Sequence, residues 1–151
     1  TIEKLLSGNG DIILLVDSGY RPETYVRRRR PTLLKLASPR STPRLLSANP
    51  QNRVLRIGQN IDPSAAHAEY TGLAFFSKQG FGLLRQAYQK ALAEKQDVHF
   101  HEAASARAAS LTDVLQELID RGVTVGCIEV TSGWMEIHSL ADYKLAHQLT
   151  S

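Results

Sequence analysis

The chain has 151 residues, of which 42% are hydrophobic and 22% are charged, with a formal net charge of +3 and a single cysteine. This composition is ordinary for a globular protein and excludes a disordered or fibrous chain. The longest apolar run, residues 12–16, is far shorter than the roughly 20 residues of a membrane helix. We therefore expect one cytoplasmic domain over residues 1–151, with no membrane partner and with Cys127 as a buried core thiol.

The charge is distributed unevenly. Residues 21–56 contain ten Arg or Lys and one acid, Glu23, so that this segment carries +9 and the rest of the chain carries −6. The basic character belongs to one segment, and a uniformly basic surface is not implied. The arginines at 27–30 lack interleaved aromatic residues beyond Tyr25, so we expect no nucleic acid partner.

The chain opens on the pattern of a helix end over residues 2–6, followed after Asp11 by a continuous apolar run at 12–16. Such a run is typical of a strand buried on both faces, and we expect it to be a central parallel strand. Residues 21–52 hold five of the six prolines with little periodicity, which predicts a long irregular excursion.

The rest of the chain alternates strand and helix patterns. In order, we predict strands over 53–57 and 69–76, a helix capped by Ser77, a helix over 111–119 ending at Gly122, strands over 123–130 and 134–138, and a final helix from Ser139. Gly72, within the second of these strands, marks a place where a side chain would intrude or a bulge is needed. The alternation predicts an α/β fold with a Rossmann-like, mainly parallel sheet flanked by helices.

Asp17 is the first candidate functional residue, because it directly follows the buried strand. Ligands of parallel α/β sheets collect at the carboxyl ends of the strands, and a carboxylate there requires a cation or several hydrogen-bond donors. The alternative is an Asx turn made with Ser18 and Gly19.

Glu136 and His138 stand two residues apart in a predicted short strand, so both side chains leave the same face. If that face looks toward Asp17, two carboxylates and an imidazole converge and can hold Mg²⁺, with Glu136 the better ligand. The alternative is an edge strand with both side chains in solvent.

A second group is formed by His99, His101 and Glu102. The alternating pattern places the two histidines on one face, where a zinc or acid–base site is conceivable. No cysteine or further histidine falls at the spacing of a structural zinc site, so we favour an ordinary surface histidine pair.

Several stretches, in this order, resemble the second half of the cytidylyltransferases that activate phosphocholine or phosphonates, including the domain fused behind phosphoenolpyruvate mutase in phosphonate biosynthesis. They are GDIILLVDS at 10–18, IGQNI at 57–61, AEYTGLA at 68–74, TDVLQELI at 112–119, GWMEIHS at 133–139 and DY at 142–143. The resemblance implies Mg²⁺-dependent transfer of CMP from CTP to a phosphonate or phosphocholine-like acceptor, with release of pyrophosphate.

The same resemblance implies roles for particular residues. Asp17 and Glu136 correspond to metal-binding and catalytic carboxylates, and the residues expected at the acceptor are Glu69, Asp113, Trp134 and His138. His138 departs from the family, since many relatives have a second acid there.

The family's opening strand, Gly-rich loop and Lys-Pro segment, which hold the triphosphate, have no counterpart in this sequence. We therefore expect a fold that is incomplete at its N-terminus and little CTP turnover by this polypeptide alone. Two alternatives stay open. One is a non-catalytic dimerisation or assembly module of a bifunctional enzyme, and a homo-oligomer fits it. The other is a sugar nucleotidyltransferase.

Overall fold

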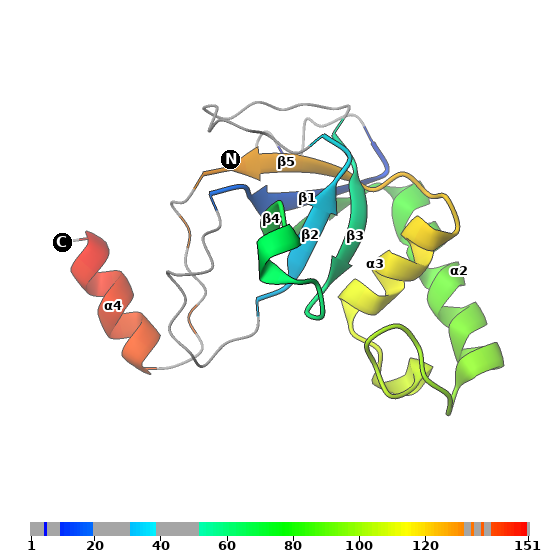
Figure 1. Ribbon diagram of the computed structural model, residues 1–151. Helices are drawn as coiled ribbons and strands as arrows, with labels where there is room; N and C mark the ends of the chain where they lie inside the picture. Colours follow the sequence, from blue (N-terminus) through cyan, green and yellow to red (C-terminus); the bar gives the residue numbers. More distant parts are fainter. Residues whose placement is uncertain are drawn as a thin grey trace.

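The computed structural model describes residues 5, 10–19, 31–38, 52–131, 134, 137 and 140–150 (Figure 1). The described strands are β1 (Ile12–Asp17), β2 (Leu33–Leu36), β3 (Val54–Gly58), β4 (Ala68–Phe76) and β5 (Gly126–Val130). The helices are α2 (Lys78–Lys95), α3 (Leu111–Asp120) and α4 (Leu140–Thr150). Two short 3₁₀ turns are also present: η2 (Pro63–Ala65) lies between β3 and β4, and η3 (Ala106–Ala108) lies between α2 and α3. Among the described residues, no helix is long and apolar enough to cross a membrane.

The five strands form one sheet in the order β3-β2-β4-β1-β5. An α/β fold is confirmed, but the expected mainly parallel, Rossmann-like sheet is not. Only β1 and β5 are parallel, whereas the β1–β4, β2–β4 and β2–β3 pairs are antiparallel. The apolar run at 12–16 indicates burial on both faces of the sheet, which is common in parallel sheets but does not determine the direction of the neighbouring strand.

The sheet curls until its two outer strands meet at one end. The amide of Val54, at the start of β3, donates to the carbonyl of Val125 at 2.8 Å, and Arg53 forms an antiparallel bridge with Gly126. Figure 1 shows β2 and β3 crossing in front of β1 and β5, with α2 and α3 together on one side. Curling brings the strand edges together and encloses the core.

Strand β2 corrects the prediction of a wholly irregular segment at 21–52. Its four residues lie between β3 and β4, with Leu33 opposite Gly58 on one side and Glu69 on the other. A run of four residues beside a proline has too little periodicity to identify a strand from sequence. Pairing with β3 on one side and β4 on the other stabilises β2.

Gly72 forms a bulge in β4, one of the two roles that the sequence indicates for it. Its φ angle is +86°, in the left-handed region that glycine adopts at no steric cost. The β1–β4 register shifts at this point, as the pairing shows: Leu14 faces Ala74, whereas Val16 faces Tyr70. The bulge therefore determines which residue of β4 lies beside the end of β1.

The predicted helices are present, and Ser77 caps α2 as predicted, whereas Ser139, the predicted cap of the last helix, lies outside the described residues. The hydroxyl of Ser77 accepts the amide of Gly80 at the start of α2. Helix α3 begins with a capping box formed by Ser110 and Asp113, and Gly122 follows its end with a φ of +82°. Helix α4 begins at Leu140, beside the predicted start.

Two hydrophobic clusters cover the two faces of the sheet. The first core cluster includes Ile12, Leu14 and Val16 of β1 and packs against α2 and α3. The second core cluster consists of Leu5, Ile13, Leu15, Ile128 and Val130, with Phe75 and Trp134 packed against it. Strand β1 is therefore buried on both faces, as its apolar run predicts. Cys127 is buried in the first cluster, which confirms its assignment to the core.

Candidate acidic site at the end of strand β1

Two acidic residues lie side by side where β1 ends. Asp17 is the last residue of β1, and Glu69 stands directly opposite it on β4. Alternation along β1 puts Asp17 on the face of Ile13 and Leu15, the face of the second core cluster, and Glu69 shares that face as its cross-strand partner. Both are buried: Asp17 is 9% exposed and Glu69 is 0% exposed. We call these two residues the acidic pair.

The carboxylate of Asp17 accepts hydrogen bonds from two directions. Its Oδ1 accepts the amide of Gly19 at 2.8 Å, which forms the Asx turn considered as one alternative. Its Oδ2 accepts the indole Nε1–H of Trp134, also at 2.8 Å. The Asx turn is therefore present, and the role of Asp17 as a metal ligand stays a prediction.

Glu69 has a strongly altered acidity. Burial raises the pKa of its carboxyl group from 4.5 to about 7, and the negative charge of Asp17 contributes to the same rise. A carboxyl group with this pKa exchanges its proton near neutral pH, a property of groups that act in proton transfer or that meet a cation. The acidic pair therefore contains one carboxyl group that accepts two N–H donors and one that is close to its titration point near neutral pH.

The acidic pair fits the coordination chemistry of Mg²⁺. This ion binds to one or two carboxylates and keeps several waters, often together with substrate phosphate oxygens. Within the part of the chain that the structure describes, no group of three or more His, Cys, Asp or Glu residues could hold a metal. Asp17 and Glu69 supply two carboxyl groups, and no third ligand of these kinds joins them within the described residues.

The other predicted site residues lie in three places. Trp134 contacts Asp17, so the structure brings it into the site. Glu136 and His138 lie outside the described residues. Asp113 lies elsewhere, at the start of α3, where its Oδ2 accepts the amide and hydroxyl of Ser110, and its Oδ1 accepts the amide of Glu102.

Asp113 belongs to a separate polar pocket of about 190 Å³ between β3, α3 and the turn at 101–102. In this pocket the carboxylate of Glu102 accepts the amides of Gln59 and Asn60 at 2.6 and 2.8 Å. Gly58, which lines it, stands three strands from Asp17 in the sheet, about 15 Å away at the usual strand spacing. Asp113 therefore does not join the acidic pair.

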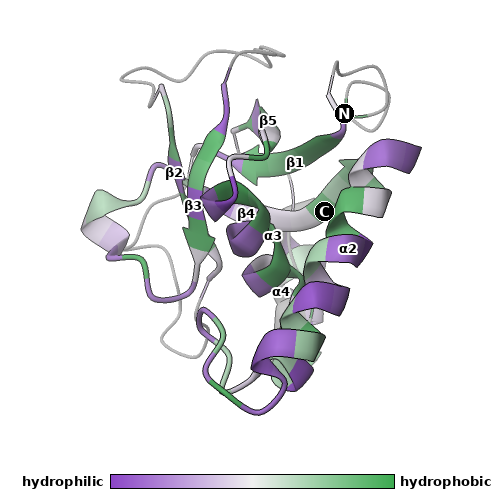
Figure 2. Cartoon of the chain, turned by 90° about the vertical axis from the view of Figure 1, so that its right-hand side faces the viewer, coloured by the Kyte–Doolittle hydropathy of each residue, from purple (hydrophilic) through white to green (hydrophobic). Residues whose placement is uncertain are grey.

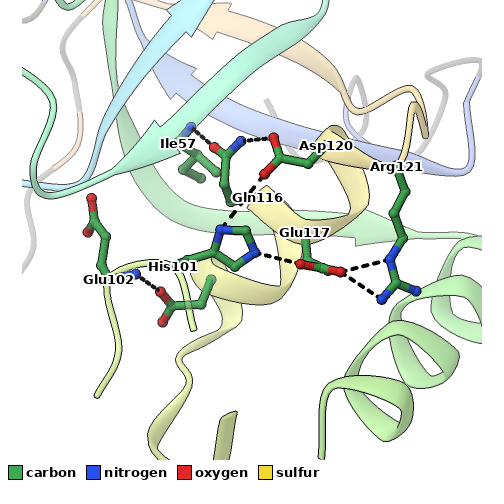
Figure 3. Close-up of polar contacts among 8 residues, drawn as sticks. Ile57, His101, Glu102, Gln116, Glu117, Asp120 and Arg121 are labelled. Carbon is green, nitrogen blue, oxygen red and sulfur yellow. Dashed lines mark hydrogen bonds and ion pairs between the residues drawn. The ribbon is translucent and has the colours of Figure 1, made fainter. Parts of the chain in front are cut away.

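The His99–His101 pattern does not form the extended segment that the alternation suggests. His101 has a φ of +53° and turns back, with its Nε2 2.8 Å from Glu117 Oε2 and its Nδ1 3.8 Å from Asp120 Oδ2 (Figure 3). Burial opposes ionisation of Glu117, but hydrogen bonds from Arg121 and His101 lower the pKa of its carboxyl group. This cluster ties the turn to α3 and is structural.

Sequence reasoning did not identify two features. The first is that Glu69 is the direct neighbour of Asp17. An acid inside the apolar strand pattern of residues 68–76 was nevertheless a sign of a special role for Glu69. The second is a buried pair in which the Asn52 amide donates to Glu129 Oε1 at 2.6 Å. Glu129 likewise interrupts an apolar run, that of β5. An acid within an apolar strand was thus the common signal.

Comparisons of the chain with protein-family models, with curated proteins and with solved structures found no match.

Proposed function

We propose that this chain supplies the metal-binding and acceptor-binding residues for a cytoplasmic Mg²⁺-dependent nucleotidyltransferase. The reaction transfers CMP from CTP to a phosphonate or phosphocholine-like acceptor and releases pyrophosphate. The observation that carries the proposal is the acidic pair at the carboxyl end of β1, with Trp134 bonded to Asp17. The motif resemblance supplies the reaction, and the arrangement of these three residues supports it.

Asp17 is the residue that we assign to Mg²⁺, with Glu69 beside it and Glu136 as a further carboxylate from the same motif set. Its backbone is fixed by β4 on one side and β5 on the other, so that the carboxylate has a defined position. When bound, Mg²⁺ would neutralise phosphate charge and orient the oxygens of the substrate. A cation at Asp17 would also favour the ionised form of Glu69.

The roles that the resemblance gives to Glu69 and Trp134 favour an acceptor whose organic part is cationic. A buried carboxylate attracts an ammonium group, and the face of an indole ring attracts quaternary ammonium through cation–π contact. Phosphocholine and 2-aminoethylphosphonate both carry such a group. We therefore rank these two acceptors above neutral sugar phosphates.

The proposed chemistry requires no proton acceptor for the acceptor oxygen. A phosphate or phosphonate group is largely ionised near neutral pH, so an oxygen already carrying negative charge attacks the α-phosphorus of CTP. The new bond joins that oxygen to the α-phosphorus, and the bond to the β-phosphate oxygen breaks as pyrophosphate leaves. Acceleration comes mainly from positioning and from charge neutralisation.

The proposal is tested by the phosphorus NMR spectra of 2-aminoethylphosphonate, phosphocholine and glucose 1-phosphate, each titrated with the protein and Mg²⁺. We expect the first two to broaden or shift only when Mg²⁺ is present, and we expect Asp17→Asn to abolish the response. Asp97→Asn, whose side chain is 79% exposed, is the matched control and should behave as wild type.

Other outcomes would redirect the assignment. An equal or stronger response to glucose 1-phosphate would favour a sugar nucleotidyltransferase. If no acceptor responds with or without Mg²⁺ while light scattering shows a stable oligomer, the assembly module is the better account.

A further inference from the structure

An apolar groove runs between the first halves of α2 and α3. It encloses about 310 Å³ and is lined mainly by Phe81, Leu84, Arg85, Tyr88, Leu111 and Val114. Phe81 is 59% exposed and Leu111 is 42% exposed, although both are large apolar side chains. In Figure 2, α2 and α3 face the viewer, and hydrophobic and hydrophilic residues alternate along α2. Exposed apolar side chains gathered around a hollow are typical of a binding surface.

The lining residues have the spacing of a helix-binding surface. Phe81, Leu84 and Tyr88 follow one another at i, i+3 and i+7 along α2, so they form one stripe. Leu111 and Val114, at i and i+3 of α3, form the facing stripe. Val114 is buried in the first core cluster and Leu84 and Tyr88 pack against it, so the floor of the groove is fixed by the core. Two parallel apolar stripes on a fixed floor suit a third helix.

Charge distinguishes among occupants of this groove. Arg85 is the charged residue among the described lining side chains, and no acidic side chain lines the groove in that part of the chain. A second copy that met this surface with its own would place Arg85 near Arg85 about the two-fold axis, which is unfavourable. The surface is also hollow, whereas a bilayer presents a broad flat surface. A partner that brings an acid to Arg85 avoids both problems.

We propose that this groove docks a helical segment of another protein, with apolar side chains at i, i+3 or i+4, and i+7 and an acidic side chain that pairs with Arg85. The apolar side chains would cover Phe81 and Leu111. This interaction is independent of the acidic pair, since α2 and α3 pack on the first core cluster and Asp17 lies on the opposite face of the sheet.

The test is selection from a random 16-residue peptide library displayed on phage, with the wild-type protein as bait and Phe81→Ser as counter-selection. The expected consensus has apolar residues at helical spacing and at least one Asp or Glu. The best peptide, made synthetically, should shift the NMR signals of Leu84, Tyr88 and Val114. Its affinity should fall about tenfold or more in Arg85→Glu.

Two control variants distinguish binding in the groove from non-specific binding to exposed hydrophobic or charged residues. Leu73→Ser removes a hydrophobic residue that is 49% exposed on β4, and Lys90→Glu reverses a charge on α2 outside the groove. Both should bind the peptide as wild type does. A cooperative thermal unfolding transition should be measured for every variant to verify that it is folded.

Several results would overturn the proposal. They are the absence of any consensus, a consensus without acids that Arg85→Glu binds equally well, and NMR shifts outside the groove. Binding of the wild type, but not Phe81→Ser, to vesicles of anionic lipid would instead assign the surface to a membrane. Self-association that Phe81→Ser abolishes would assign it to a second copy.

Discussion

The position of Glu69, fully buried beside a second carboxyl group, predicts an unusual dependence of stability on pH. Because burial and the charge of Asp17 raise its pKa to about 7 from 4.5, the folded protein holds this proton more tightly than the unfolded chain does. The resulting stabilisation is complete below the unfolded pKa and is lost as the pH rises through the folded pKa. One pKa unit corresponds to about 1.4 kcal/mol, so the whole difference is worth roughly 3 kcal/mol at most.

Replacing Glu69 by glutamine isolates this effect, because the amide has nearly the same shape and does not titrate. The free energy of unfolding of Glu69→Gln, relative to wild type, should increase by roughly 2–3 kcal/mol between pH 5 and pH 8.5. Urea unfolding followed by circular dichroism at several pH values measures it, provided that the urea dependence is unchanged. Asp97→Asn, an exposed acid, is the control and should show no such trend.

The reasoning is refuted if the stability difference between Glu69→Gln and wild type is constant with pH. It is equally refuted if the difference shrinks as the pH rises, since Glu69 would then be stabilised in its ionised form.

Three further substitutions test the packing around the helices. Gly58→Ala places a methyl group against the Glu102 carboxylate, which would lose its hydrogen bonds from backbone amides, and should cost about 1–3 kcal/mol of stability. In a double-mutant cycle, Glu102→Ala should remove most of that cost. If the two stability losses simply add, the contact between Gly58 and Glu102 is contradicted. In Gly80→Ala the new methyl group would clash with the rigid backbone carbonyl of Asp11, so this variant should have a lower thermal midpoint than Gly58→Ala. Equal midpoints for the two variants would argue against the close approach of Gly80 to Asp11. Ser110→Ala removes the cap of α3 and should cost about 1 kcal/mol in urea unfolding, whereas an unchanged stability would show that the cap is dispensable.

Local patterns predicted most of the elements because their causes are local. Strand β1 follows from its apolar run, α2 from the cap at Ser77, and the end of α3 from Gly122. The direction of the strands could not be predicted in the same way. It depends on how the chain returns to the sheet, and the four-residue strand β2 supplies an antiparallel neighbour for both β3 and β4.

The acidic pair was predictable in its members but not in its geometry. Continuing the register from Ile12 and Phe76 without a bulge would place Thr71 opposite Asp17. The bulge at Gly72 shifts β4 by two residues, so that a carboxyl group lies there instead of a hydroxyl group. The glycine was visible in the sequence, but the size of the shift depends on the paired strands together.

The central claim, that Asp17 holds Mg²⁺ beside Trp134, is tested most directly by fluorescence. Trp134 is the only tryptophan in the chain, and its indole donates to Asp17 Oδ2, so its emission reports on this carboxylate. Titration with Mg²⁺ should change the emission saturably in the wild type and in Asp97→Asn, and should leave Asp17→Asn unchanged. An emission that ignores Mg²⁺ in the wild type, or that responds equally in Asp17→Asn, would contradict the account.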